Sequence, residues 1–133
     1  MKNIHKLAAI DIGSNAVRLL ITSIRINKSE TKFKKISLVR VPLRLGEDVF
    51  SKGKILNKTL KKLQKTLKAF KILMQMHEVY IFKAVATSAM REAENSTKII
   101  EDIFKKLSIK IDLISGKKEA LMIANCLLYT SDA

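Results

Sequence analysis

One carboxylate inside an apolar run constrains this chain more than any other feature. Asp11 lies between Ile10 and Ile12, and a short polar segment from Gly13 to Asn15 separates this run from a second apolar stretch. Two apolar stretches joined so closely predict a tight β-hairpin with its polar groups at the turn. Burying a charge is costly unless it meets a cation, water or hydrogen-bond donors. We therefore expect the turn to offer N–H groups and a hydroxyl to a phosphate, beside an acid able to hold a metal's water shell.

Size and composition predict a single domain in a reducing compartment. The chain has 133 residues, of which 47% are hydrophobic, which is enough for the core of one domain. It has one cysteine, Cys126, which excludes a disulfide framework and makes the cytoplasm the expected location. The first apolar run is cut by Asp11, which does not fit a signal peptide, and no run approaches the ~20 apolar residues of a membrane span. The net charge of +14 attracts polyanions without choosing among them.

Hydrophobic periodicity predicts the order β-β-β-α-β-α-β-α. The expected strands cover residues 6–12, 17–26, 39–45, 79–85 and 109–114, with a polar turn at 27–32. The first expected helix covers residues 54–76. Two later helices are expected to begin at a cap residue, which is Asn95 or Ser96 for one and Ser115 for the other. A short helix is expected just after residue 86. The long helix is able to cross over to a parallel strand, so the five-stranded mixed sheet should have the order 3-2-1-4-5. Pro42 cannot donate to a ladder, which places the third strand at a sheet edge or a bulge, and the order 3-2-1-4-5 puts it at an edge.

The helix predicted at 54–76 has one apolar and one basic side. Its apolar stripe runs from Leu56 to Met74, and the opposite side carries Lys54, Lys58, Lys61, Lys65 and Lys68. Such a row has two interpretations. It is a cationic rail for a polyanion, or it is an ordinary solvated surface, and the second interpretation is the more common one for charge runs.

The segment from Asp11 to Arg18 resembles the first phosphate loop of the actin-like ATPase superfamily. Further blocks at matching spacing are Leu43–Glu47, Ala84–Ala93, Asn95–Ser96 and Ile114–Gly116 with Glu119 and Ala120. Together, across residues 6–128, they resemble the N-terminal domain of the exopolyphosphatase/guanosine pentaphosphate phosphohydrolase (Ppx/GppA phosphatase) family. The resemblance implies a ribonuclease H-like or actin-like ATPase fold with helices on both faces of the sheet. Residues 1–128 would then form the N-terminal lobe, and residues 129–133 a disordered tail.

The resemblance also implies an activity and a set of site residues. Family members remove the terminal phosphate of inorganic polyphosphate or guanosine pentaphosphate with Mg²⁺, in a cleft between two lobes. Matched by position, Glu119 is the catalytic base, Asp11 is the metal-side acid, and Gly13, Ser14, Asn15 and Arg91 bind phosphate. The second lobe is absent from the 133 residues, so this chain alone is expected to fold but to hydrolyse little. The implied partners are the substrate, the C-terminal lobe and, in the full-length protein, a second copy in a homodimer.

Simpler interpretations stand beside these assignments. Arg91 also has the spacing to pair with Glu94 on a helix surface, while Thr87 and Ser88 read as helix caps rather than ligands. Two other functions stay open: a lobe of an actin-like sugar or acetate kinase or ATPase, and a non-catalytic basic module that binds polyanions. Aromatic residues make up only 5% of the chain and no base-stacking platform is visible, so nucleic acid is not expected as a partner, nor is a membrane.

Overall fold

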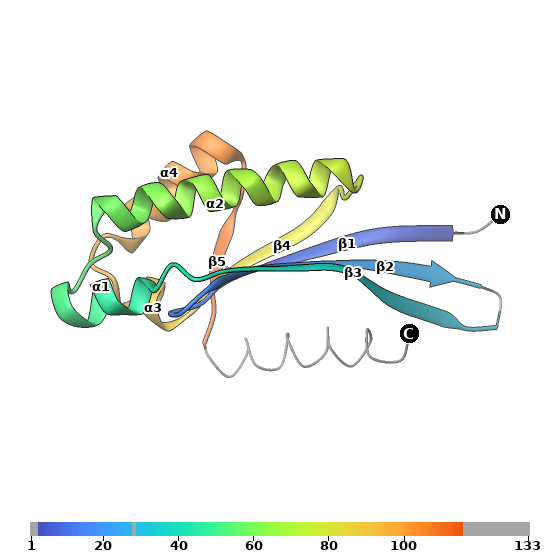
Figure 1. Ribbon diagram of the computed structural model, residues 1–133, viewed down its shortest axis with the longest axis horizontal. Coiled ribbons are helices and arrows are strands. Elements are labelled where there is room, and N and C mark those ends of the chain that lie inside the picture. Colours follow the sequence, from blue (N-terminus) through green and yellow to red (C-terminus); the bar gives the residue numbers. More distant parts are fainter. Residues whose placement is uncertain (1–2, 28, 116–133) are drawn as a thin grey trace.

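A five-stranded sheet with helices packed on it forms the domain in the computed structural model, which describes residues 3–27 and 29–115 (Figure 1). The elements in chain order are β1 (Asn3–Ile12), β2 (Val17–Ile26), β3 (Thr31–Val41), α1 (Leu45–Lys52), α2 (Asn57–Met76), β4 (Ile81–Ala86), α3 (Ser88–Glu92), α4 (Ser96–Leu107) and β5 (Ile111–Leu113). No helix within the described ranges combines the length and hydrophobicity that crossing a bilayer requires.

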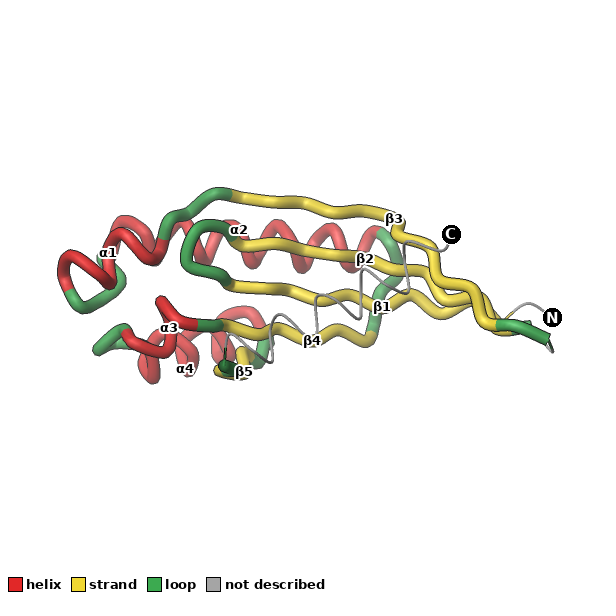
Figure 2. The backbone as a smooth tube through the Cα atoms, turned by 90° about the horizontal axis from the view of Figure 1, so that it is seen from below, coloured by secondary structure: helices red, strands yellow, loops and turns green. Residues whose placement is uncertain are grey.

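The sheet has the order β3-β2-β1-β4-β5, as predicted. β1 pairs with β2 and β2 with β3 in antiparallel fashion, whereas β4 pairs in parallel with β1 and β5 in parallel with β4. The central strand β1 is therefore where an antiparallel half meets a parallel half. The turn after β1 and the segment after β4 leave the sheet at the same end, where α1 and α3 also lie (Figure 2).

The core lies between the sheet and the two longer helices, α2 and α4, which share one face of the sheet (Figure 1). The predicted apolar stripe of α2 is confirmed, since Leu63, Leu67, Phe70 and Met74 are all buried. On β1, Ile10 and Ile12 are fully buried in the same cluster. The helix predicted after Ser115 to cover the other face lies outside the described residues, as does the tail at 129–133, so both stay predictions.

Two boundaries differ from the prediction around the third strand. β3 begins at Thr31, much earlier than expected, and ends at Val41, so Pro42 follows the strand instead of lying inside it. The strand is nevertheless at the sheet edge. Residues 45–52, read as the end of a strand and a loop, form the helix α1, which the sequence analysis missed. Arg44 adopts a left-handed conformation, with φ 56°, and turns the chain from strand into helix.

The start of α4 also corrects an expectation. Asn95 occupies the cap position, but among the described residues its side chain makes no capping hydrogen bond. The amide instead bridges to the backbone of Ile55, whose N–H donates to Asn95 Oδ1 at 3.1 Å and whose carbonyl accepts from Nδ2 at 2.9 Å. Asn95 therefore ties the segment before α2 to the start of α4.

Candidate active site

The turn between β1 and β2 is closed by its own backbone. The N–H of Gly13 donates to the carbonyl of Ala16 at 3.0 Å. A side chain on Gly13 would place its Cβ 3.1 Å from that same oxygen, tighter than nine in ten real contacts. The close approach of two backbone segments therefore favours glycine here, because any larger residue would force the Ala16 carbonyl to shift. The predicted hairpin with polar residues at its turn is confirmed.

Helix α1 holds the turn from one side. The N–H of Arg44 donates to the carbonyl of Asn15 at 3.0 Å, and the N–H of Gly46 donates to the carbonyl of Ser14 at 2.9 Å. A Cβ on Gly46 would lie 3.2 Å from the Cβ of Ser14, so the absence of a side chain lets the helix approach the turn this closely. The first turn of α1, which the sequence analysis missed, is thus a structural support of the phosphate loop.

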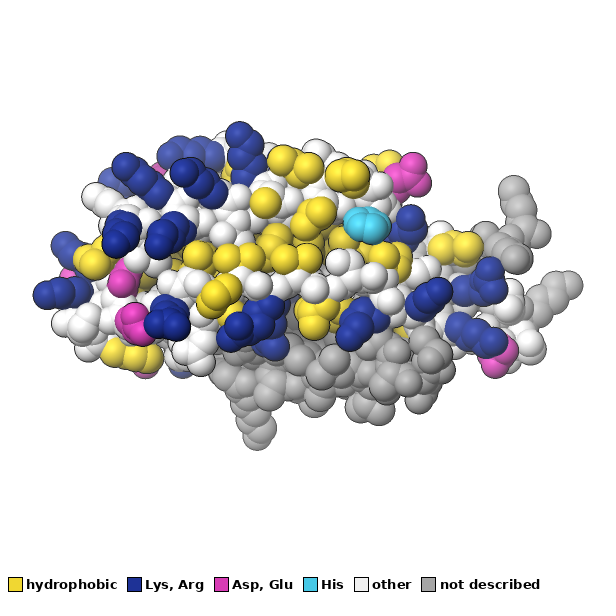
Figure 3. Space-filling view, viewed as in Figure 1, with side chains coloured by type: hydrophobic (Ala, Val, Ile, Leu, Met, Phe, Trp, Pro, Cys, Tyr) yellow, Lys and Arg dark blue, Asp and Glu magenta, His cyan; other side chains and the backbone are white. Residues whose placement is uncertain are grey.

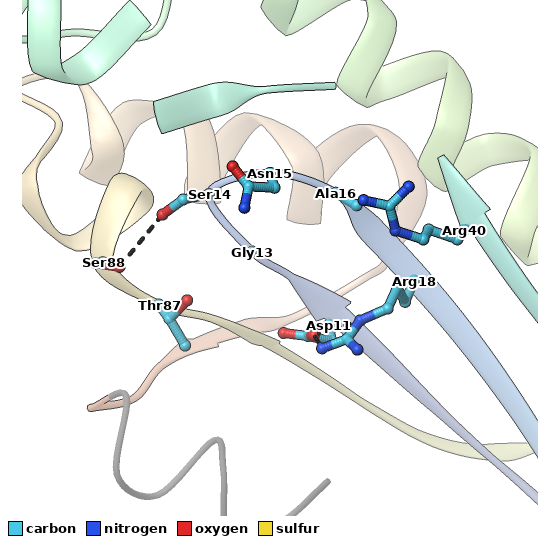
Figure 4. Close-up of a pocket in the computed structure, with 9 residues that line it drawn as sticks. All are labelled: Asp11, Gly13, Ser14, Asn15, Ala16, Arg18, Arg40, Thr87 and Ser88. Carbon is cyan, nitrogen blue, oxygen red and sulfur yellow. Dashed lines mark hydrogen bonds and ion pairs between the residues drawn. The ribbon is translucent and has the colours of Figure 1, made fainter. Parts of the chain in front are cut away.

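The segment between β4 and α3 holds the turn from the other side. The N–H of Thr87 donates to the carbonyl of Ile12 at 3.3 Å, and the hydroxyls of Ser14 and Ser88 lie 3.2 Å apart (Figure 4). The prediction that Thr87 or Ser88 caps a helix is correct in position for Thr87 but not in hydrogen bonding. Thr87 occupies the cap position of α3 but makes no side-chain capping bond among the described residues. Both residues line the same hollow as the turn.

Asp11, Arg18 and Arg40 form a row of charges across three strands. Asp11 pairs with Arg18 in the register of β1 and β2, and Arg18 pairs with Arg40 in the register of β2 and β3. Directly paired residues project on the same face, so the three side chains share one side of the sheet. The strand neighbours of Asp11, Ile10 and Ile12, point into the core beneath α2, and alternation therefore turns the charged row to the opposite face.

The buried carboxylate of Asp11 has one satisfied and one unsatisfied oxygen. Oδ2 accepts from Arg18 Nε at 3.0 Å and from Arg18 Nη2, whereas Oδ1 is buried and has no hydrogen-bond partner among the described residues. The Asp11 side chain is 10% exposed and that of Arg18 38% exposed. Among the described residues, Arg18 is thus the cation that this buried carboxylate needs, and Oδ1 has no partner.

These residues surround a hollow of about 370 Å³ at the end of the sheet. It is lined by Asp11, Gly13, Ser14, Asn15, Ala16, Arg18, Arg40, Thr87 and Ser88 (Figure 4). Two guanidinium groups against one carboxylate leave the lining net positive, and three hydroxyls add hydrogen-bonding capacity. The hollow lies beyond the carboxyl end of β1, where the strand order reverses, which is where open α/β sheets bind ligands. The arrangement is suited to an oxyanion such as a phosphoryl group.

The donor set fits one mode of binding for a divalent cation. Among residues 3–27 and 29–115, no cluster of three or more His, Cys, Asp or Glu side chains exists that would hold a metal by itself. Mg²⁺, however, commonly keeps several waters and binds through one or two carboxylates together with substrate phosphates. Asp11 lines the hollow and its Oδ1 has no hydrogen-bond partner among the described residues, so the residues present fit this mode of binding.

The predicted site residues have different outcomes. Asp11, Gly13, Ser14 and Asn15 come together in the hollow. Arg91 is not among the residues lining it. Its guanidinium donates from Nη1 to the carbonyl of Ile114 at 3.1 Å, fastening α3 to the end of β5. Within the described part of the chain, Arg91 forms no ion pair with Glu94 either. Glu119 lies outside the described residues, so its catalytic role stays a prediction.

Sequence reasoning missed the two arginines of the hollow. Arg18 belongs to the quoted phosphate-loop segment but received no role, and Arg40 lies in the predicted third strand and also received none. The signal for Arg18 was present in the hairpin register. Four residues separate Ile12 from Val17 in the turn, so Asp11 must face Arg18 on the neighbouring strand. Arg40 required the register of β3, which the misplaced strand boundary concealed.

Solved structures share this fold. A Ppx/GppA family member from Aquifex aeolicus matches with a TM-score of 0.79 and 29% identity, over 88% of this chain and 37% of that one. An exopolyphosphatase from Cytophaga hutchinsonii matches with a TM-score of 0.77 and 30% identity, over 87% of this chain and 36% of that one. Both proteins extend well beyond the part that this chain matches.

Proteins related to this chain in sequence also carry phosphatase names. A bifunctional 3-dehydroquinate synthase/phosphatase from Fusobacterium nucleatum is 38% identical over 125 residues, which are 90% of this chain and 18% of that protein. Exopolyphosphatase 1 from Mycobacterium bovis is 30% identical over 115 residues, which are 86% of this chain and 33% of that enzyme. The chain thus spans a third or less of the length of these relatives. The model of the Ppx/GppA phosphatase family matches residues 24–132, most of the chain, and the chain therefore belongs to that family.

Proposed function

We propose that this chain is the N-terminal lobe of a phosphoanhydride hydrolase that removes the terminal phosphate of inorganic polyphosphate, guanosine pentaphosphate or both. The family match and the relatives named as exopolyphosphatases support this reaction class. The observation that carries the proposal is the hollow, because it combines a tight glycine turn, serine and threonine hydroxyls, two guanidinium groups and a carboxylate with one oxygen unpartnered among the described residues.

The residues of the hollow would bind and orient the terminal phosphoryl group. Phosphoryl transfer needs little covalent help from the protein; it depends on positioning and on neutralising charge on the phosphoryl oxygens. Arg18 and Arg40 supply positive charge, and guanidinium groups match phosphate oxygens in geometry. The hydroxyls of Ser14 and Ser88, 3.2 Å apart, are placed to donate to oxygens of the same group.

Hydrolysis then requires a water molecule and a base. The oxygen of the water attacks the terminal phosphorus, the bond from that phosphorus to the bridging oxygen breaks, and the shortened chain leaves with that oxygen. A carboxylate in the role expected of Glu119 accepts the proton of the water. Mg²⁺, held by Asp11 Oδ1 directly or through water, would supply further neutralisation of the phosphate charge when bound.

The proposed assembly is a two-lobed enzyme. The hollow is open on one side, and the second lobe expected from the family would supply the opposite wall of the cleft and further phosphate ligands. We expect a homodimer of the complete protein, located in the cytoplasm as the single cysteine suggests. The 133-residue chain alone should bind phosphate chains but release little inorganic phosphate.

The test measures phosphate release by the complete gene product that carries this chain. Polyphosphate, guanosine pentaphosphate and ATP are supplied separately with Mg²⁺, and Glu119→Gln is compared with Glu101→Gln, which alters an exposed carboxylate on α4. We expect hydrolysis of one or both of the first two substrates, abolished only by Glu119→Gln. Turnover of ATP alone would contradict the proposal and favour a kinase or ATPase lobe, and equal effects of the two variants would remove Glu119 from the reaction.

A further inference from the structure

Helix α2 carries an unbalanced row of positive charge. Its 20 residues contain six lysines and no acidic residue. Solvated helices usually intersperse acids at i+3 or i+4 from lysines, because like charges at those spacings repel one another. Lys61, Lys65 and Lys68 follow such a spacing and are all exposed. The helix therefore retains a repulsion that a bound anion would relieve.

A second helix adds to this charge. A groove of about 240 Å³ runs between α2 and α4, and Lys106 of α4 joins the three α2 lysines along its rim. Within the described part of the chain, none of these four lysines forms an ion pair with a carboxylate. Basic side chains lie over the half of α2 next to α1, with few acids among them (Figure 3).

The end of the groove is fixed by a fifth lysine. Lys71 donates from Nζ to the carbonyl of Leu107 at 2.6 Å, where α4 ends. This bond ties the C-terminal end of α4 to α2 and sets the separation of the two helices there. Ile103 and Leu107 form the floor between the lysine stems. The rim lysines are therefore presented on a rigid base rather than on a loop.

We propose that this lysine groove is a second binding site, specific for long chains of inorganic polyphosphate. At about 240 Å³ the groove is smaller than pockets that enclose small molecules, and its charges are spread along a helix, so it suits a flexible chain lying along it. Lys61 and Lys68 are seven residues apart, or about 10 Å along the helix axis. A polymer with a charge on every repeat is able to contact several of these lysines at once.

The groove is separate from the candidate active site. It shares no residue with the hollow, and α2 covers the sheet face opposite to the charged row of Asp11, Arg18 and Arg40. A long chain held in the groove would keep its free end at a raised effective concentration near the hollow. Triphosphate is too short for this, so the site would favour long substrates. This inference rests on the proposed activity toward polyphosphate.

The test is binding of polyphosphate to the 133-residue chain at several salt concentrations. The variant Lys61→Gln/Lys65→Gln/Lys68→Gln is compared with Lys32→Gln/Lys34→Gln/Lys35→Gln, which removes the same charge from exposed positions of β3. We expect the groove variant to lose about tenfold or more in affinity for long-chain polyphosphate and to show a shallower salt dependence, because fewer counterions are released. The β3 variant should lose less than about threefold, and circular dichroism should show both folded.

Three further measurements separate this inference from the proposed function. Triphosphate binding, which uses the hollow, should be unchanged by the groove variant and weakened by Ser14→Ala. Replacing the three groove lysines by arginine should restore long-chain binding. Equal losses in the groove and β3 variants would reduce the effect to net charge and overturn the proposal. Tighter binding of a single-stranded RNA with the same number of phosphates would make the groove a nucleic-acid surface and also overturn it, whatever the hydrolysis assay shows.

Discussion

Two glycine substitutions should separate the shape of the phosphate loop from the stability of the domain. In Gly46→Ala the new Cβ would lie 3.1 Å from Phe50 Cε2 and 3.2 Å from Ser14 Cβ. The ring of Phe50 is 67% exposed and is free to swing away. Ser14 is less free, because its carbonyl accepts from residue 46 itself and its hydroxyl lies beside that of Ser88. The turn must therefore shift by a few tenths of an ångström.

The stability change in Gly46→Ala should be small. Alanine is favoured over glycine by up to about 1 kcal/mol inside a helix, which offsets the close contact. We expect the free energy of unfolding to change by less than about 1 kcal/mol. A displacement of about 1 Å at a site is able to cost about a hundredfold in function, so the smaller shift here should weaken triphosphate binding about threefold to tenfold. Urea denaturation and isothermal titration calorimetry measure the two quantities.

Gly53→Ala is the matched control with the opposite outcome. Gly53 ends α1 in a left-handed conformation, φ 76°, and does not line the hollow. A Cβ there strains the backbone by about 1–2 kcal/mol, while the nearest atom, Glu94 Oε1 at 3.3 Å, belongs to a flexible side chain. Stability should fall and triphosphate affinity should stay constant. If Gly46→Ala lowers stability by more than about 2 kcal/mol and leaves binding intact, the close contact does not control the loop and the reasoning is refuted.

Three further predictions follow from individual contacts. Arg18→Gln leaves the buried Asp11 carboxylate without its cation and should cost about 2 kcal/mol of unfolding free energy in urea denaturation. Arg40→Gln should weaken triphosphate binding but change stability by less than about 0.5 kcal/mol. Equal destabilisation by the two variants would contradict the pairing of Asp11 with Arg18. Asp11→Asn should abolish the gain in triphosphate affinity produced by Mg²⁺ in calorimetric titrations, and a retained gain would place the metal elsewhere. Asn95→Ala removes both hydrogen bonds to Ile55 and should cost about 2 kcal/mol in thermal unfolding, with the exposed Thr97→Ala expected to change stability little.

The fold was predictable where periodicity and connection rules agree. The stripe of Leu63, Leu67 and Phe70 identified α2, and a helix of that length permits a crossover to a parallel strand, which fixes the sheet order. The start of β3 was concealed because its first half carries Lys32, Lys34 and Lys35, which obscure the alternation of an edge strand. Helix α1 was missed because the segment from Leu43 to Leu45 alternates like a strand and glycine at position 46 reads as a terminator.

The candidate site was predictable only where its residues are consecutive. Gly13, Ser14 and Asn15 stand together in the turn, so their location followed from the hairpin. Ser88 and Arg40 reach the hollow from other elements, and their arrival depends on the crossover and on a strand register that local patterns do not encode. Helix α1 did leave a signal of its own, with acids at 47 and 48 in its first turn, Lys52 in its last turn and Gly53 after it.

The hydrogen bonds from α1 to the turn have a consequence for the electric field in the hollow. The carbonyl oxygens of Ser14 and Asn15 carry partial negative charge, and both are engaged by N–H groups of residues 44 and 46. If α1 came away, those two oxygens would seek new donors and would present negative dipoles beside an incoming phosphate. Loss of this short helix would thus lower the affinity for an anion even with the hydrophobic core intact, because the exposed carbonyl dipoles repel negative charge. Substitutions along Leu45–Lys52 therefore offer a way to tune anion affinity without changing a residue that lines the hollow.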